Sequence, residues 1–162
     1  MEKIAVFPGS FDPVTIGHES VLRRALPLFD KIIVMIGVNN TKKFLFPIEA
    51  RKQMIEDIFS DDPKVEVQIY NGLTVDFCRK VGATYVLRGL RTSADFEYER
   101  AIAQVNKKMF NNIETIFILT MPEHTPINSS VVRDIITHKG DVSMFLSQKL
   151  DIKKYIENEN VE

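Results

Sequence analysis

The chain has 162 residues, of which 44% are hydrophobic and 27% charged, a composition typical of a folded protein with one core and unlike that of a disordered segment. Its 21 basic and 22 acidic residues nearly cancel, which argues against a nucleic-acid-binding protein held by a general positive field. No apolar run reaches the roughly 18 residues that a membrane-spanning helix needs, so a membrane protein is not expected.

Short β-branched runs alternate with segments of helical period, the pattern of a parallel sheet with helices on both faces. The predicted strands are Ile4–Phe7, Ile32–Val38, Val65–Tyr70, Tyr85–Leu87 and Glu114–Leu119. The predicted helices are Gly17–Phe29, Ile48–Phe59, Thr74–Val81, Ser93–Phe110, Ser129–His138 and Ile152–Glu157, and the polar tail Glu157–Glu162 is expected to fray. With right-handed crossovers, this order predicts one Rossmann-like α/β domain spanning residues 1–162, built on a five-stranded parallel sheet.

The single cysteine and the first residues of the sequence indicate in which cellular compartment the protein is expected. Cys78 has no partner for an intramolecular disulfide, and the segment MEKIAVF lacks the basic and long apolar regions of a secretion signal. We therefore expect a cytoplasmic protein. Cys78 lies in the apolar series Val75, Phe77, Cys78 and Val81, which predicts a buried hydrophobic side chain and not a nucleophile.

The strongest local signal follows the first strand, where PGSFDPVTIGH supplies two glycines, a hydroxyl and His18 at the start of a helix. A helix N-terminus offers unpaired N–H groups and a partial positive charge, which predicts a phosphate site. His18 shares a helical stripe with Val21, Leu22 and Ala25, so its ring should point inward and could donate a hydrogen bond to a phosphate oxygen. By itself, a lone histidine on an apolar stripe is more typical of a core residue whose hydrogen bonds are satisfied than of a ligand-binding residue.

Other residues at the carboxyl ends of the strands favour the phosphate site. They are Lys42, the pair Arg88 and Arg91, and the pair Ser129 and Ser130. Taken singly, these residues are typical of a solvated loop, a surface ion pair and a helix cap supplied by Asn128 or Ser129. Their common position is what points to a ligand, because parallel sheets bind ligands at that edge.

Several other chemistries have no support in the sequence. There is neither a G-x-x-x-x-G-K-[ST] loop nor a G-x-G-x-x-G after the first strand. His18, His124 and His138 with one cysteine have no metal-ligand spacing, so magnesium would have to arrive with the nucleotide. Asp95 and Glu99 share a helix face while Glu97 points away, and most of this acidic group is expected to be solvated.

Two motifs together resemble those of a known superfamily. Thr15-Ile16-Gly17-His18 matches the T/H-x-G-H motif of the nucleotidyltransferases, and the segment NSSVVR at 128–133 resembles their second motif, I-S-S-x-x-[RK]. Nearly end to end, the chain resembles the bacterial phosphopantetheine adenylyltransferase family. The resemblance implies an enzyme of coenzyme A biosynthesis that moves AMP from ATP to 4′-phosphopantetheine, giving dephospho-coenzyme A and pyrophosphate by direct in-line attack.

The resemblance also implies individual roles. His18 would stabilise the transition state, with Ser10, Lys42 and Arg91 as further catalytic groups, and the acceptor would be held by Ser10, Lys42, Thr74 and Arg88. ATP would be held by Ser10, Phe11, His18, Gly89, Leu90, Arg91, Glu99, His124, Thr125, Pro126, Ile127, Asn128, Ser129 and Ser130. Magnesium bound with ATP and a homohexameric assembly are implied by the family alone. Asn128 departs from the usual serine, which should alter only the details of the triphosphate contacts.

Two alternatives remain. A related nucleotidyltransferase could use nicotinate mononucleotide or glycerol 3-phosphate, although the second motif lacks the Arg-Thr-rich form of members that use CTP. A non-catalytic nucleotide sensor on the same scaffold should lack His18, Lys42 or Arg91, and all three are present.

Overall fold

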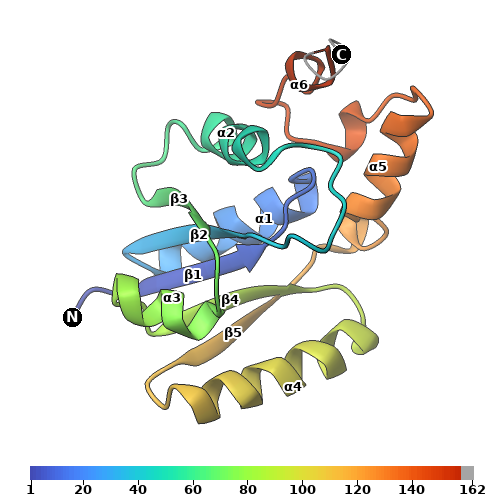
Figure 1. Ribbon diagram of the computed structural model, residues 1–162. Coiled ribbons are helices and arrows are strands. Elements are labelled where there is room, and N and C mark those ends of the chain that lie inside the picture. Colours follow the sequence, from blue (N-terminus) through green and yellow to red (C-terminus); the bar gives the residue numbers. More distant parts are fainter. Residues whose placement is uncertain (158–162) are drawn as a thin grey trace.

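A parallel sheet forms the centre of the protein in the computed structural model, which describes residues 1–157 (Figure 1). Its strands are β1 (Ile4–Gly9), β2 (Lys31–Gly37), β3 (Val65–Tyr70), β4 (Tyr85–Leu90) and β5 (Glu114–Leu119). They lie in the order β3-β2-β1-β4-β5, and every neighbouring pair is parallel. The predicted Rossmann-like α/β class and strand number are confirmed. The chain moves outward from β1 to β3 and then returns to β4, so the direction of winding changes beside β1, where such sheets bind ligands.

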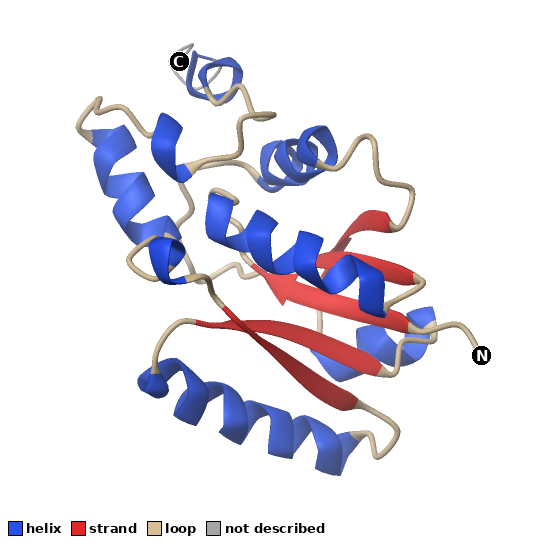
Figure 2. Cartoon of the chain, turned by 180° about the vertical axis from the view of Figure 1, so that it is seen from behind, coloured by secondary structure: helices blue, strands red, loops and turns tan. Residues whose placement is uncertain are grey.

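Helices cover both faces of the sheet (Figures 1 and 2). They are α1 (Ile16–Ala25), α2 (Ile48–Ile58), α3 (Thr74–Val81), α4 (Ser93–Met109), α5 (Ser129–Thr137) and α6 (Lys153–Glu157), with short 3₁₀ turns at Leu26–Leu28, Pro122–His124 and Ser143–Phe145. No helix within residues 1–157 is long and apolar enough to cross a bilayer.

The side chains of β1 alternate between the two faces of the sheet, and a hydrophobic cluster lies on each face. Ala5 and Phe7 point into the larger cluster with buried residues of α1, α2 and α5, whereas Val6 points to the opposite face, where α3 packs. Cys78 of α3 is buried in this second cluster, as predicted, and burial raises the pKa of its thiol to about 12. The thiol is therefore a packing group and not a nucleophile.

Three predicted boundaries are wrong in ways that matter. β4 does not end at Leu87, because the segment Arg88–Leu90 continues to pair with Phe117–Leu119 of β5. β1 likewise continues through Pro8 and Gly9 beside β2. The first helix ends at Ala25, and a 3₁₀ turn follows, since Pro27 has no N–H with which to extend the α-helical ladder. Of the tail expected to fray, residues 158–162 lie outside the described residues.

Candidate active site

A cavity of about 330 Å³ opens where β1 and β4 end, at the change in winding direction. Its walls come from the ends of β1 and β4, the start of α1, the β2–α2 loop, the first half of α4 and the start of α5. The lining residues that bear on function are Ser10, Phe11, Asp12, Thr15, His18, Lys42, Arg88, Gly89, Arg91, Asp95, Glu99, Ile127, Asn128, Ser129, Ser130 and Arg133. The fold thus brings together segments that are more than a hundred positions apart in the sequence.

His18 is held by the cap of its own helix. The backbone N–H of Thr15 donates to His18 Nδ1 at 3.0 Å, and the Thr15 hydroxyl accepts from the backbone N–H of His18 at 3.4 Å. Because Nδ1 accepts this bond, the neutral ring carries its proton on Nε2. The ring of Phe11 packs edge-on against the imidazole with 5.1 Å between centroids.

The surroundings of His18 keep its ring neutral. Burial, assisted by the positive charges of Arg88 and Arg91, lowers the pKa of His18 from 6.5 to about 4. At neutral pH the side chain is therefore an uncharged imidazole that offers one N–H donor to the cavity. This is the inward-facing hydrogen-bond donor that the sequence predicted.

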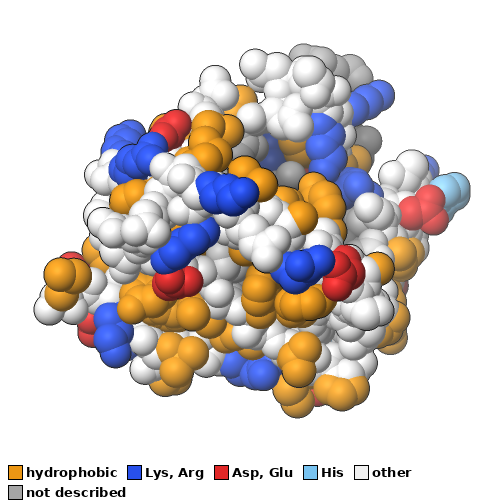
Figure 3. Space-filling view, turned by 90° about the horizontal axis from the view of Figure 1, so that it is seen from below, with side chains coloured by type: hydrophobic (Ala, Val, Ile, Leu, Met, Phe, Trp, Pro, Cys, Tyr) orange, Lys and Arg blue, Asp and Glu red, His pale blue; other side chains and the backbone are white. Residues whose placement is uncertain are grey.

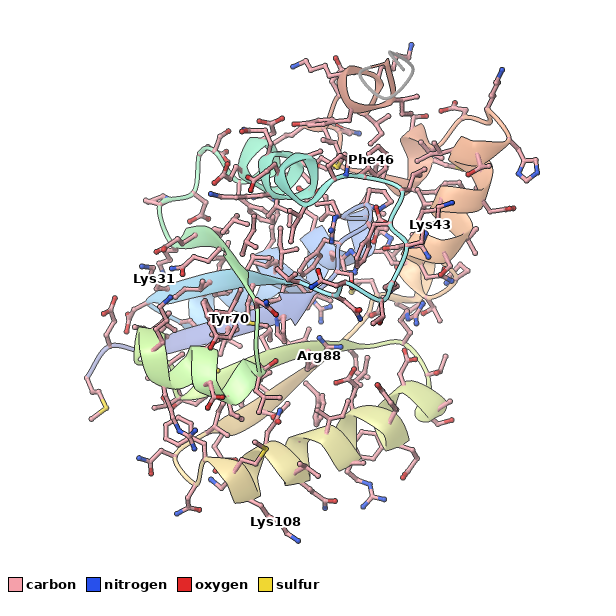
Figure 4. The ribbon with its side chains drawn as sticks, viewed as in Figure 1. Lys31, Lys43, Phe46, Tyr70, Arg88 and Lys108 are labelled. Carbon is pink, nitrogen blue, oxygen red and sulfur yellow. The ribbon has the colours of Figure 1, made fainter. Side chains whose placement is uncertain are left out.

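Arg88 is fixed by a bidentate ion pair. Its Nε and Nη2 donate to the two carboxylate oxygens of Glu99 at 2.8 and 2.6 Å, and Nη1 donates to the carbonyl of Pro8. Figure 4 shows Arg88 on β4, between the central strands and α4. Glu99 is 8% exposed, so the expectation that this acidic group is mostly solvated is wrong for Glu99. Within residues 1–157, the guanidinium still has N–H groups that no acceptor uses, and these can bind an anion.

The other cations of the cavity differ in how much of their charge is compensated. Arg91 pairs with Asp95 at 3.1 Å. Lys42 is exposed on the β2–α2 loop, and within residues 1–157 its recorded contact is with the ring of Phe44, 5.6 Å from Nζ to the centroid. Lys42 therefore brings a positive charge that no carboxylate of the described chain neutralises.

The start of α5 forms another wall of the first cavity. Of the two predicted capping residues, Asn128 is the N-cap, and its Oδ1 accepts from the N–H of Val131 at 2.9 Å. The hydroxyl of Ser129 donates to the carbonyl of Pro13, and that of Ser130 accepts from Arg133. The helix dipole and the free N–H groups of the first turn favour an anion here.

A second cavity of about 350 Å³ adjoins the first. The two share Pro8, Gly9, Ser10, Arg88 and Glu99 as a common wall. The outer part is lined by apolar groups and amides: Met35, Val38, Asn39, Thr74, Tyr98, Ile102, Ala103 and Asn106. This mixture suits a long ligand that is apolar along its length and has amide groups.

Most residues singled out in the sequence meet at these cavities. Ser10, Phe11, His18, Lys42, Arg88, Gly89, Arg91, Glu99, Ile127, Asn128, Ser129 and Ser130 line the first cavity, and Thr74 lines the second. Leu90, His124, Thr125 and Pro126 line neither, and their binding roles stay predictions. Asp12, Thr15 and Arg133 were not predicted as site residues, although the last two belong to the quoted motifs.

Comparison with known proteins points to one family. Residues 6–135 match the cytidylyltransferase-like family model. Phosphopantetheine adenylyltransferase of Flavobacterium johnsoniae is 50% identical over 93% of this chain and 98% of the relative, and that of Bacteroides thetaiotaomicron is 47% identical over 91% and 97%. A solved structure described as a nicotinate-nucleotide adenylyltransferase from Vibrio parahaemolyticus superposes with a TM-score of 0.71, covering 98% of this chain and 94% of that one, at 18% identity. That likeness concerns the fold alone.

Proposed function

The chain belongs to the phosphopantetheine adenylyltransferase family of nucleotidyltransferases, and on this basis we propose that it transfers AMP from ATP to 4′-phosphopantetheine, giving dephospho-coenzyme A and pyrophosphate. The observation that carries the proposal is the common wall of the two cavities. Ser10 and Arg88 belong to both, so ligands in the two cavities would meet at these residues. Two substrates that exchange a phosphoryl-type group need such a meeting point.

ATP is assigned to the first cavity. Its β- and γ-phosphates would lie at the start of α5, where the backbone N–H groups of Ser129 and Ser130 and the hydroxyl of Ser130 can donate to them. Arg91 adds positive charge to the same cavity, which Gly89 also lines. The α-phosphate would then lie beside His18.

The acceptor is assigned to the second cavity. The pantetheine arm is flexible, largely apolar and carries two amide groups, which matches a wall of apolar side chains with Asn39 and Asn106. Its phosphate would lie at the common wall, held by Ser10, Arg88 and the uncompensated charge of Lys42. Thr74 lines the part of the cavity away from His18.

In the proposed reaction a phosphate oxygen of the acceptor attacks the α-phosphorus of ATP. One P–O bond forms as the bond to pyrophosphate breaks, with no covalent enzyme intermediate. Negative charge builds on the oxygens of the α-phosphate, and the Nε2–H of neutral His18 donates to one of them. Losing such a donor costs on the order of 10²- to 10³-fold in kcat.

Magnesium is proposed to arrive with ATP, bound to its phosphate oxygens. Within residues 1–157 no group of three or more His, Cys, Asp or Glu side chains could hold a metal ion. The acidic residues in the first cavity support this assignment, because Asp95 and Glu99 are engaged by Arg91 and Arg88. When bound, the ion supplies charge neutralisation at the triphosphate.

A cytoplasmic homohexamer is proposed from the family. Figure 3 views the molecule from the side on which α4 lies, and hydrophobic side chains are spread over that face. Phe96, Val105 and Met109 of α4 are exposed by 39, 55 and 43%. Helices with several exposed apolar residues are typical of subunit interfaces, so light scattering after gel filtration should give an oligomer.

The test of the proposed function is pyrophosphate release from ATP and magnesium with three acceptors: 4′-phosphopantetheine, nicotinate mononucleotide and glycerol 3-phosphate. The proposal expects release with 4′-phosphopantetheine alone. Faster release with another acceptor would refute the assigned substrate while leaving the nucleotidyltransferase chemistry intact. Binding of ATP without release for any acceptor would favour the nucleotide sensor.

A further inference from the structure

Arg51 is a buried arginine outside both cavities. It lies in the first turns of α2, is 2% exposed, and lines neither cavity. Burying a guanidinium is costly unless its donors and its charge are satisfied. The groups that satisfy Arg51 belong to the two loops that carry Ser10 and Lys42.

The guanidinium joins those two loops. Its Nη1 donates to the carbonyl of Ser10 at 2.8 Å, and its Nε donates to the carbonyl of Phe46 at 3.0 Å. The flat face of the same group lies over the ring of Phe44, with 4.0 Å from Cζ to the centroid. Lys42 lies near the same ring, with Nζ 5.6 Å from the centroid. Figure 4 shows the loop running from Lys43 to Phe46 and into α2.

Asp12 holds the same loop from the other side. Its carboxylate, 2% exposed, accepts from the N–H groups of Leu45 and Phe46 at 2.8 and 2.9 Å. Asp12 also supplies the negative charge that offsets the burial of Arg51. The β1–α1 and β2–α2 loops are thus held together by two buried side chains. Asp12, in the first loop, accepts from the backbone of the second, and Arg51, in α2, donates to a carbonyl of each loop.

We propose that Arg51 is a positioning residue for the reaction, which holds Ser10 at the common wall of the two cavities and Lys42 in the wall of the first cavity. This inference rests on the proposed function, because Lys42 and Ser10 are the groups assigned to the acceptor phosphate. Arg51 acts through three contacts: the Ser10 carbonyl, the Phe46 carbonyl and the Phe44 ring. With them in place, the loop that carries Lys42 has one arrangement before the acceptor binds.

An arginine is required for this arrangement. A planar guanidinium can donate in its plane to two carbonyls while its face stacks on a ring, whereas a lysine ammonium is a point charge that cannot do all three. Arg51→Lys therefore keeps the positive charge beside Asp12 but cannot keep both in-plane hydrogen bonds together with the stacked contact to the Phe44 ring. Phe44→Leu is the complementary change, since it keeps both hydrogen bonds and removes the stacked ring at a half-buried position.

The chain contains a control for the substitution itself, at an exposed arginine with similar contacts. Arg79 of α3 also donates to a backbone carbonyl, that of Met109, and lies over the ring of Phe110 with 4.9 Å from Cζ to the centroid. It lines neither cavity. Arg79→Lys thus makes the same chemical change at a site remote from Lys42.

The experiment combines hydrogen exchange with kinetics on the full-length protein. In Arg51→Lys, exchange at the N–H groups of Leu45 and Phe46 should accelerate at least about tenfold, with smaller changes elsewhere. The value of kcat/KM for 4′-phosphopantetheine should fall at least about tenfold, and the KM for ATP should change less than about threefold. Phe44→Leu should shift these quantities in the same direction by less, and Arg79→Lys should leave them at the wild-type values.

A double-mutant cycle with Lys42→Ala separates positioning from general stability. If Arg51 acts through Lys42, the kinetic penalty of Arg51→Lys should largely disappear in the Lys42→Ala background. An undiminished penalty, unchanged exchange of the loop, or an equal loss for ATP and acceptor would overturn the proposal. A wild-type protein that is inactive with 4′-phosphopantetheine would instead refute the proposed function, and it would do so before any variant is compared.

Discussion

Acidification should destabilise the folded protein through His18, by an amount that follows from the environment of the ring. Burial beside Arg88 and Arg91 lowers the pKa of His18 from 6.5 to about 4, so between these values the unfolded chain binds a proton that the folded chain does not. Above pH 6.5 the ring is neutral in both the folded and the unfolded chain, so its protonation does not reduce the unfolding free energy. As the pH falls from 6.5 toward 4, the unfolding free energy decreases because only the unfolded chain gains the proton. From about pH 7.5 to about pH 5 this linkage removes about 2 kcal/mol of unfolding free energy.

His18→Asn is the matched variant for this measurement. The asparagine amide oxygen can accept the Thr15 N–H that His18 Nδ1 accepts, but the side chain does not titrate. The unfolding free energies of both proteins are measured in urea at the two pH values. In the difference between the two proteins, the contributions of all other titrating groups cancel. The wild type should lose about 2 kcal/mol more than His18→Asn on acidification. Equal losses would refute the reasoning, because they would mean that folded His18 takes up its proton as readily as the unfolded chain does.

Three further predictions concern other parts of the molecule. Glu99→Ala should lower the unfolding free energy by about 2 to 4 kcal/mol, because it removes the bidentate partner of Arg88, whose side chain is only 30% exposed, and a loss below about 1 kcal/mol in urea unfolding would contradict this. Cys78 should react with a thiol reagent at less than about 1% of its rate in denaturant, and rapid labelling of the folded protein would disprove its burial. Asn128→Ala should cost about 1 kcal/mol by uncapping α5 and Asn128→Ser should restore most of it, so equal melting temperatures of all three proteins would show that the cap to Val131 contributes nothing.

Features with a local cause were predictable from the sequence. The limits of β3, β5 and α3 agree with the predicted Val65–Tyr70, Glu114–Leu119 and Thr74–Val81. The hydrophobic runs of these three elements end at turn residues, so the local sequence alone defines their limits. The N-cap at Asn128 and the inward position of His18 also follow from rules that act within one helical turn.

Features that depend on tertiary pairing were not predictable. Arg88 and Gly89 read as a loop, but β5 supplies the partners that extend β4 through them. Glu99 reads as a solvated carboxylate on α4 until β4 brings Arg88 to within 2.8 Å of it. The sequence alone indicates no role for Arg51, and only the fold places the carbonyl of Ser10 beside it, 41 positions away. No local pattern distinguishes these residues from ordinary surface charges.

Neutral His18 is proposed to promote adenylyl transfer to 4′-phosphopantetheine by donating from Nε2. The most direct test of this role is the rate of dephospho-coenzyme A formation at saturating ATP and acceptor, compared between the wild type and His18→Asn. We expect product from the wild type and a rate at least about 10²-fold lower for the folded variant, with ATP binding retained. A variant rate within about tenfold of the wild type would refute this role of His18, since the Nε2–H donor would then contribute little to the transition state.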